Sequence, residues 1–97
     1  MDKYPKIESV YPSPNYHLLI VFRNNVVKVY DCTPLLEEEV FRPLATESLF
    51  TQVRAGTGGY GVIWNDELDL SESELWLNSR EAKNLPLEAL LARQNVS

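Results

Sequence analysis

The sequence predicts a small α+β protein in which an antiparallel sheet is covered on one face by helices. Short runs of β-branched and aromatic residues, separated by turn residues, fill the first thirty positions and are typical of strands. A capping signal and short amphipathic segments then predict helices further along the chain. Strands and helices follow the order β-β-β-α-β-α, which is grouped and not strictly alternating, and this favours an α+β fold over an α/β fold.

The length and composition allow one domain with a short appendage. The chain has 97 residues, of which 44% are hydrophobic and 24% charged, as in ordinary globular proteins. The length excludes a multi-domain enzyme, and the composition argues against disorder along the whole chain. We divide it into an α+β domain at residues 1–79 and a helical tail at residues 80–97, where the pattern changes to REAKNLPLEALLARQNVS.

The charge and cysteine content restrict the partners and the compartment. Fourteen acidic residues against nine basic ones give a net charge of -5, which repels nucleic-acid backbones and anionic lipid. The single cysteine, Cys32, cannot form an internal disulfide, and the first ten residues lack an apolar signal segment. No apolar run approaches the ~20 residues that span a bilayer. We therefore expect a cytoplasmic protein without membrane contact.

The first half of the chain predicts three strands joined by turns. Asparagine tolerates the positive φ that a tight hairpin turn requires, so Asn24 and Asn25 predict a hairpin between the second and third strands. Prolines after the first strand predict a rigid turn there. The strands are expected at residues 6–11, 16–23 and 26–30.

The second half predicts two helices around one further strand. Residues 31–45 contain Pro34 and Pro43 as helix breakers, and we expect a loop with at most one helical turn. Ser71 followed by Glu74 matches a capping box, in which each side chain bonds the backbone N–H of the other residue. The predicted elements are a helix capped by Thr46 that carries Leu49, Phe50 and Val53 on one side, a strand at 60–64, and a helix at 72–79 with Leu75 and Trp76 inward.

The residues that could support catalysis are few. His17 is the one histidine, and a Cys–His nucleophile would require Cys32 to meet it across the hairpin strands. An isolated histidine or cysteine in a strand region is far more often structural. A zinc site takes three or four such ligands. We therefore predict a non-enzyme with no cofactor.

Two other patterns are superficially similar to binding sites. Asp66, Glu67 and Asp69 are carboxylates that could hold a divalent cation, but their spacing does not fit a calcium loop, and we assign them to a turn and to helix entry. The GTGGYG segment at 56–61 lacks a following Gly-Lys-Ser/Thr and precedes a strand, so it predicts a flexible turn and not a phosphate loop. Residues 37–39, all glutamate, predict a solvated acidic face.

Residues 7–75 resemble the small bacterial family known as domain of unknown function 2442. The resemblance is carried by the segments KIESV, LLIVF, VVKVYD, FRPLATESLF and VIWNDELDLSESEL, in that order. Asn25 stands where family members often have glycine in the hairpin turn. The resemblance implies a small α+β domain without an established activity, found beside small toxin-type proteins in operons and therefore suspected as an antitoxin. In other members a helix-turn-helix follows the domain.

The tail at 80–97 is similar to the start of Cro and phage-repressor helix-turn-helix domains. Residues 84–86 would form the first turn, 87–93 the second helix, and 93–97 the turn before the recognition helix; Pro86 departs from the usual capping serine or threonine. The alternative is a plain amphipathic helix whose leucines pack on the body or on a second subunit. If a missing recognition helix normally covers this stripe, Leu87, Leu90 and Leu91 are expected to contact a partner or a second copy of the chain.

These observations predict a non-catalytic regulatory domain, the N-terminal part of a bacterial transcriptional regulator. The helix that reads base edges would follow residues 80–97, so this chain alone should not bind DNA specifically, and DNA binding would belong to a longer parent chain. The alternative function is a stand-alone antitoxin-like or adaptor protein that masks a partner through its acidic sheet face or its tail. The expected partners are a second copy of the chain, in a dimer, or another small protein.

Overall fold

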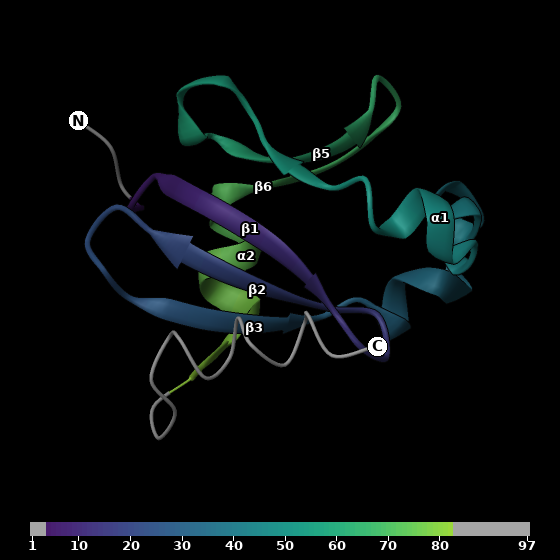
Figure 1. The fold of residues 1–97 in the computed structure, drawn as a ribbon, viewed down its shortest axis with the longest axis horizontal. Helices are drawn as coiled ribbons and strands as arrows, with labels where there is room; N and C mark the ends of the chain where they lie inside the picture. The colour runs from purple at the N-terminus through teal and green to yellow at the C-terminus, as the bar shows by residue number, and fades with distance from the viewer. Residues whose placement is uncertain (1–3, 83–97) are drawn as a thin grey trace.

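The computed structural model describes residues 4–82, which form two antiparallel sheets, two short α-helices and three 3-10 segments (Figure 1). The four-stranded first sheet has the order β1-β2-β3-β7, and the second sheet has the order β4-β5-β6. The first sheet contains β1 (Ile7–Ser13), β2 (His17–Phe22), β3 (Val27–Asp31) and β7 (Arg80–Glu81). The second contains β4 (Arg54–Ala55), β5 (Gly61–Asn65) and β6 (Leu68–Ser71). The coarse prediction of a small α+β protein with antiparallel strands is confirmed.

The predicted hairpin between the second and third strands is present. Asn25 has φ of 71°, and its N–H donates to the Phe22 carbonyl at 2.9 Å. The Asn24 side chain also accepts from the N–H of Val26 at 3.1 Å. This turn sets the antiparallel register of β2 and β3, in which Leu19 lies opposite Val29 and Ile20 opposite Lys28.

The single sheet and the simple element order that we predicted are wrong. Strand β6 was missed because Asp69 and Ser71, which alternate with Leu68 and Leu70, were assigned to the entry of the following helix. Strands β4 and β7 have two residues each, so their own sequence carries no strand pattern. Both are strands because they pair with longer neighbours, β5 and β3.

The helical elements are short. The segment predicted as a loop forms the 3-10 helices η1 (Thr33–Glu37) and η2 (Glu39–Ala45), and α1 (Glu47–Phe50) is shorter than expected. Thr46 occupies the N-cap position of α1, but its side chain makes no capping bond. The third 3-10 segment, η3 (Thr57–Gly59), joins β4 to β5.

Helix α2 (Glu72–Asn78) begins at Ser71, as the sequence predicts. The Ser71 hydroxyl accepts from the N–H of Glu74 at 3.2 Å, which satisfies one free donor of the first turn. The reciprocal half of the predicted box is replaced by another contact, because the Glu74 carboxylate accepts from the Tyr30 hydroxyl at 2.8 Å. The capping serine therefore starts the helix, and the glutamate ties it to β3.

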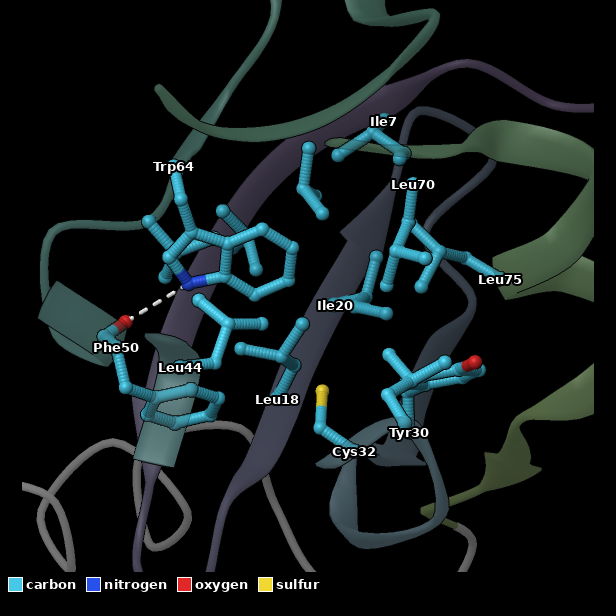
Figure 2. Close-up of a cluster of buried hydrophobic side chains, with 14 of the residues drawn as sticks. Ile7, Leu18, Ile20, Tyr30, Cys32, Leu44, Phe50, Trp64, Leu70 and Leu75 are labelled. Carbon is cyan, nitrogen blue, oxygen red and sulfur yellow. Dashed lines mark hydrogen bonds between the residues drawn. The ribbon is translucent and has the colours of Figure 1, made fainter. Parts of the chain in front are cut away.

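One hydrophobic core lies between the first sheet, α2 and the second sheet (Figures 1 and 2). Trp64 of β5 is 2% exposed and donates from its indole N–H to the Phe50 carbonyl at 3.0 Å, which satisfies its one polar group. Leu75 is fully buried, and the Trp76 ring meets the Phe22 ring edge-on at 5.0 Å. The inward placement predicted for both α2 residues is confirmed.

Candidate functional site

The structure does not bring Cys32 and His17 together as a catalytic pair. Asp31 lies opposite His17 in the register of β2 and β3, whereas Cys32, the next residue, points into the core beside Leu18 (Figure 2). Cys32 has no exposed surface. Burial, followed by the charge of Asp31, raises the pKa of the thiol to about 12, so the nucleophilic thiolate is suppressed at neutral pH.

His17 is held by local contacts at one end of the first sheet. Its Nδ1 lies 2.9 Å from the Asn15 carbonyl and 3.2 Å from the Pro14 carbonyl, and its Nε2 lies 3.8 Å from the Asp31 carboxylate. The pKa of Asp31 is lowered mainly by hydrogen bonds from the Thr33 hydroxyl and N–H. These contacts fix the turn between β1 and β2 and the end of β3, and they leave no acid–base pair facing the core.

The acidic segment is divided between a turn and a strand. The Asn65 side-chain oxygen accepts from the N–H groups of Glu67 and Leu68, at 2.8 and 3.0 Å, so the predicted turn around Asp66 is confirmed. Asp69 lies in β6 opposite Ile63 and does not contribute to helix entry, which corrects our assignment. Within residues 4–82, no group of three or more His, Cys, Asp or Glu side chains could hold a metal ion.

The glycine-rich segment forms the predicted turn before a strand. Gly58 and Gly59 have φ of 80° and 77°, a conformation that side chains disfavour. A Cβ atom on Gly59 would lie 2.6 Å from the Ile7 carbonyl oxygen, so this glycine also lets the turn approach β1. Backbone geometry and close packing therefore explain both glycines.

Sequence reasoning missed a set of polar contacts that fix α2 on the first sheet. Lys28 is only 9% exposed, and its ammonium donates to the Trp76 carbonyl at 2.5 Å and lies 4.1 Å from the Trp76 ring centre. Lys6 bonds the Glu72 carboxylate at 2.8 Å. The strand phase could have indicated the first contact, because Lys28 shares a face with Tyr30, which is buried and bonds Glu74.

The opposite face of the first sheet, which we call the outer face, is aliphatic in its middle. The registers place Leu19 between Tyr11 and Val29 in one cross-strand row, and Val21 between Ser9 and Val27 in the next. Leu19 is buried and the other members of both rows are half-buried. The outer face is defined here by Tyr11, Leu19, Val21, Val27 and Val29.

The outer face differs from the acidic sheet face that we expected for partner binding. A polar row of Ser13, His17 and Asp31 borders it at one end, and the rows between that end and the hairpin are apolar except for Ser9. The three consecutive glutamates at 37–39 are exposed, as predicted, but they lie at the η1 and η2 segments and not on a strand. The predicted contact residues Leu87, Leu90 and Leu91 lie outside the described residues.

Comparison with known proteins adds the family to this geometry. The model of a family of proteins of unknown function, DUF2442, matches residues 7–81. The chain belongs to the DUF2442 family. No curated protein and no solved structure matches it. The DUF2442 match ends with β7, so it covers only the first two residues of the segment 80–97 that resembles a helix-turn-helix. No helix within residues 4–82 has the length and apolar character needed to span a membrane.

Proposed function

We propose that this DUF2442 chain is a non-catalytic regulatory domain, the N-terminal part of a bacterial transcriptional regulator, which binds a polypeptide segment on its outer face. The apolar outer face carries the proposal. Antiparallel sheets with one solvated face usually place polar side chains there, whereas Leu19, Val21, Val27 and Val29 form a continuous aliphatic surface. A continuous apolar surface of this kind is typical of a docking site.

The state of the candidate nucleophile supports a non-catalytic role. Cys32 is enclosed by the core, and its raised pKa keeps it as a thiol at neutral pH. We therefore expect Cys32→Ala and His17→Ala to retain the regulatory activity of the chain. A folded variant of either residue that loses a measured activity at an unchanged melting temperature would contradict this role.

The charge of the chain supports assigning DNA binding to a longer parent. A net charge of -5 disfavours close approach to phosphates. The similarity of residues 80–97 to the start of a repressor-type helix-turn-helix suggests how such a parent would continue. In that arrangement the DUF2442 body supports the DNA-binding unit and does not itself contact DNA.

The same outer face also favours a second candidate, an antitoxin-like or adaptor protein that binds a separate small protein. The natural reading frame after codon 97 distinguishes the two. A frame that continues into a recognition helix supports the regulator, and the parent should then repress a reporter driven by its own upstream region. A stop codon at that point would contradict the regulator and favour the adaptor.

A further inference from the structure

We infer that residues 33–50, which we call the strap, open from the core as a unit, and that Tyr16 is the latch that holds the strap closed. The strap contains η1, η2 and α1, leads from β3 towards β4, and lies at one end of the first sheet (Figure 1). Its opening goes beyond the proposed function, since it does not depend on what the outer face binds.

Few buried side chains attach the strap to the core. Among residues 33–50, all of which the structure describes, the buried side chains are those of Leu35, Leu44 and Phe50. Most of the other residues are exposed, and the helical elements are two short 3-10 segments and a four-residue α1. Segments with few buried apolar contacts open at a lower free-energy cost than core strands do. The strap is therefore suited to local opening.

Tyr16, in the turn between β1 and β2, contacts the strap near both of its ends. The Tyr16 hydroxyl donates to the Ala45 carbonyl at 2.6 Å, and the Tyr16 ring meets the Phe50 ring edge-on at 5.3 Å. The Tyr16 carbonyl accepts at 2.9 Å from the N–H of Cys32, the residue that precedes the strap. The Trp64 indole holds the Phe50 end as well, but Tyr16 joins that end to the beginning of the strap.

The latch is strained in the closed state. Asn15 and Tyr16 have φ of 62° and 60°, in the left-handed region. Asparagine adopts this conformation readily, whereas it costs free energy for a bulky aromatic residue. Such a conformation persists only where surrounding contacts enforce it, and the contacts of Tyr16 with the strap and with Cys32 do so here. Opening lets the turn relax, so the strain opposes the contacts that close the strap.

Cys32 can report the opening in the full chain. Its side chain has no exposed surface and belongs to the same core cluster as Leu18 and Leu44, of which Leu44 lies in the strap (Figure 2). An aromatic disulfide reagent, dithiobis(nitrobenzoate), reaches this thiol only after the strap or the whole protein opens. We expect a modification rate that depends weakly on urea, because local opening exposes little surface. Amide exchange of Ile20, in the middle of the first sheet, should show the stronger urea dependence of global unfolding.

Variants of Tyr16 test the latch. Tyr16→Phe keeps the ring and removes the bond to Ala45, so Cys32 modification should accelerate about fivefold, the effect of one net hydrogen bond. Tyr11→Phe, in β1, is the matched control and should leave the rate unchanged. Tyr16→Ala should react several-fold faster than Tyr16→Gly, because glycine fits the left-handed conformation and alanine does not. An unchanged rate in Tyr16→Phe, or an alanine variant slower than the glycine variant, would overturn the latch.

Lys28→Ala separates local opening from global unfolding. It removes a contact of α2, which stays in place when the strap opens, and it should speed amide exchange of Ile20 by about tenfold or more. Cys32 modification should keep its rate, because α2 is intact in both the closed and the open state. Equal acceleration at Cys32 and Ile20 would show that the thiol reacts only from the unfolded chain, and would overturn the opening of the strap.

Discussion

The two faces of the first sheet are built from the same three strands but differ in how they are covered. The inner face carries Leu18, Ile20 and Phe22, all without exposed surface, under α2 and the second sheet. It also carries the polar groups of Lys28 and Tyr30, which bond α2. The outer face is more uniformly aliphatic, yet no described element contributes to it except the strands themselves. Side-chain polarity along a strand therefore does not identify the core face of this protein.

Strand β3 shows the reason most clearly. A simple alternation rule would place Val27 and Val29 in the core and Lys28 in solvent. The structure has the reverse, because the lysine donates to the Trp76 carbonyl in the last turn of α2, where the helix dipole favours a cation. A polar side chain with a specific partner can thus occupy the core face, and the valines become available for another contact.

The largest difference between the faces is expected from a pair of neighbouring truncations. Phe22→Ala removes a buried ring that packs edge-on against Trp76, and it should lower the free energy of unfolding by about 3–5 kcal/mol. Val21→Ala, on the half-buried outer face, should cost only about 1 kcal/mol. Urea denaturation of both variants measures the difference. Equal losses would contradict the assignment of the core to the inner face.

A smaller effect should follow from removing the polar partner of α2. Lys28→Ala leaves the Trp76 carbonyl without its charged donor, and the expected loss is about 1.5–3 kcal/mol in the free energy of unfolding. Lys28→Met keeps most of the apolar stem, so it separates the loss of the charge from the loss of packing. Arg23→Ala, at an exposed position in the hairpin turn, is the control and should change little. An unchanged stability of Lys28→Ala would show that the helix contact contributes nothing.

The elements that the sequence predicted correctly are those encoded by local chemistry. Asn25 in the hairpin turn, Ser71 at the start of α2 and the glycines before β5 act through their own backbone or an adjacent N–H group. Their signals therefore need no knowledge of the rest of the fold.

The features that could not be predicted depend on distant partners. Strand β7 exists because Arg80 and Glu81 meet β3, some fifty residues earlier in the chain. The division into two sheets depends on how β5 and β6 pack against the first sheet, and no local pattern records this. The outer face was missed for the same reason, since it appears only when the registers of β1, β2 and β3 place five side chains together.

The pKa of Cys32 measures how completely the inner face is shielded from solvent. Burial raises its pKa to about 12, whereas the unfolded thiol ionises near 8.5. A raised pKa contributes stability that is complete below about pH 8.5 and is lost as the pH rises toward 12. Between pH 8.5 and 10 the free energy of unfolding should therefore fall by about 1 kcal/mol per pH unit through this group.

The matched variant for this titration is Cys32→Ala, which removes the ionisable group from the inner face. Between pH 8.5 and 10 the free energy of unfolding of this variant should fall less steeply than that of the unsubstituted chain. The difference between the two slopes should equal the contribution of Cys32 given above. Denaturant titrations at several pH values measure both slopes. Identical slopes would show that Cys32 ionises as easily in the folded protein as in the unfolded chain, which contradicts a sealed inner face.

The smallest effect is expected at the solvent side of the second sheet, where the acidic residues of the β5–β6 turn lie. Asp66 is exposed in the turn, and Asp69 is exposed on β6 between the buried Leu68 and Leu70. A ligand that binds only the folded state stabilises it by RT ln(1 + [L]/Kd), or about 2.7 kcal/mol at one hundred times Kd. Because we assign these carboxylates to the turn and the strand surface, millimolar Mg²⁺ or Ca²⁺ should leave the melting temperature unchanged. Calorimetry with and without each cation measures this, and Asp66→Asn with Asp69→Asn is the control. A saturable rise in melting temperature that the double substitution abolishes would identify a metal site at this turn and contradict the assignment.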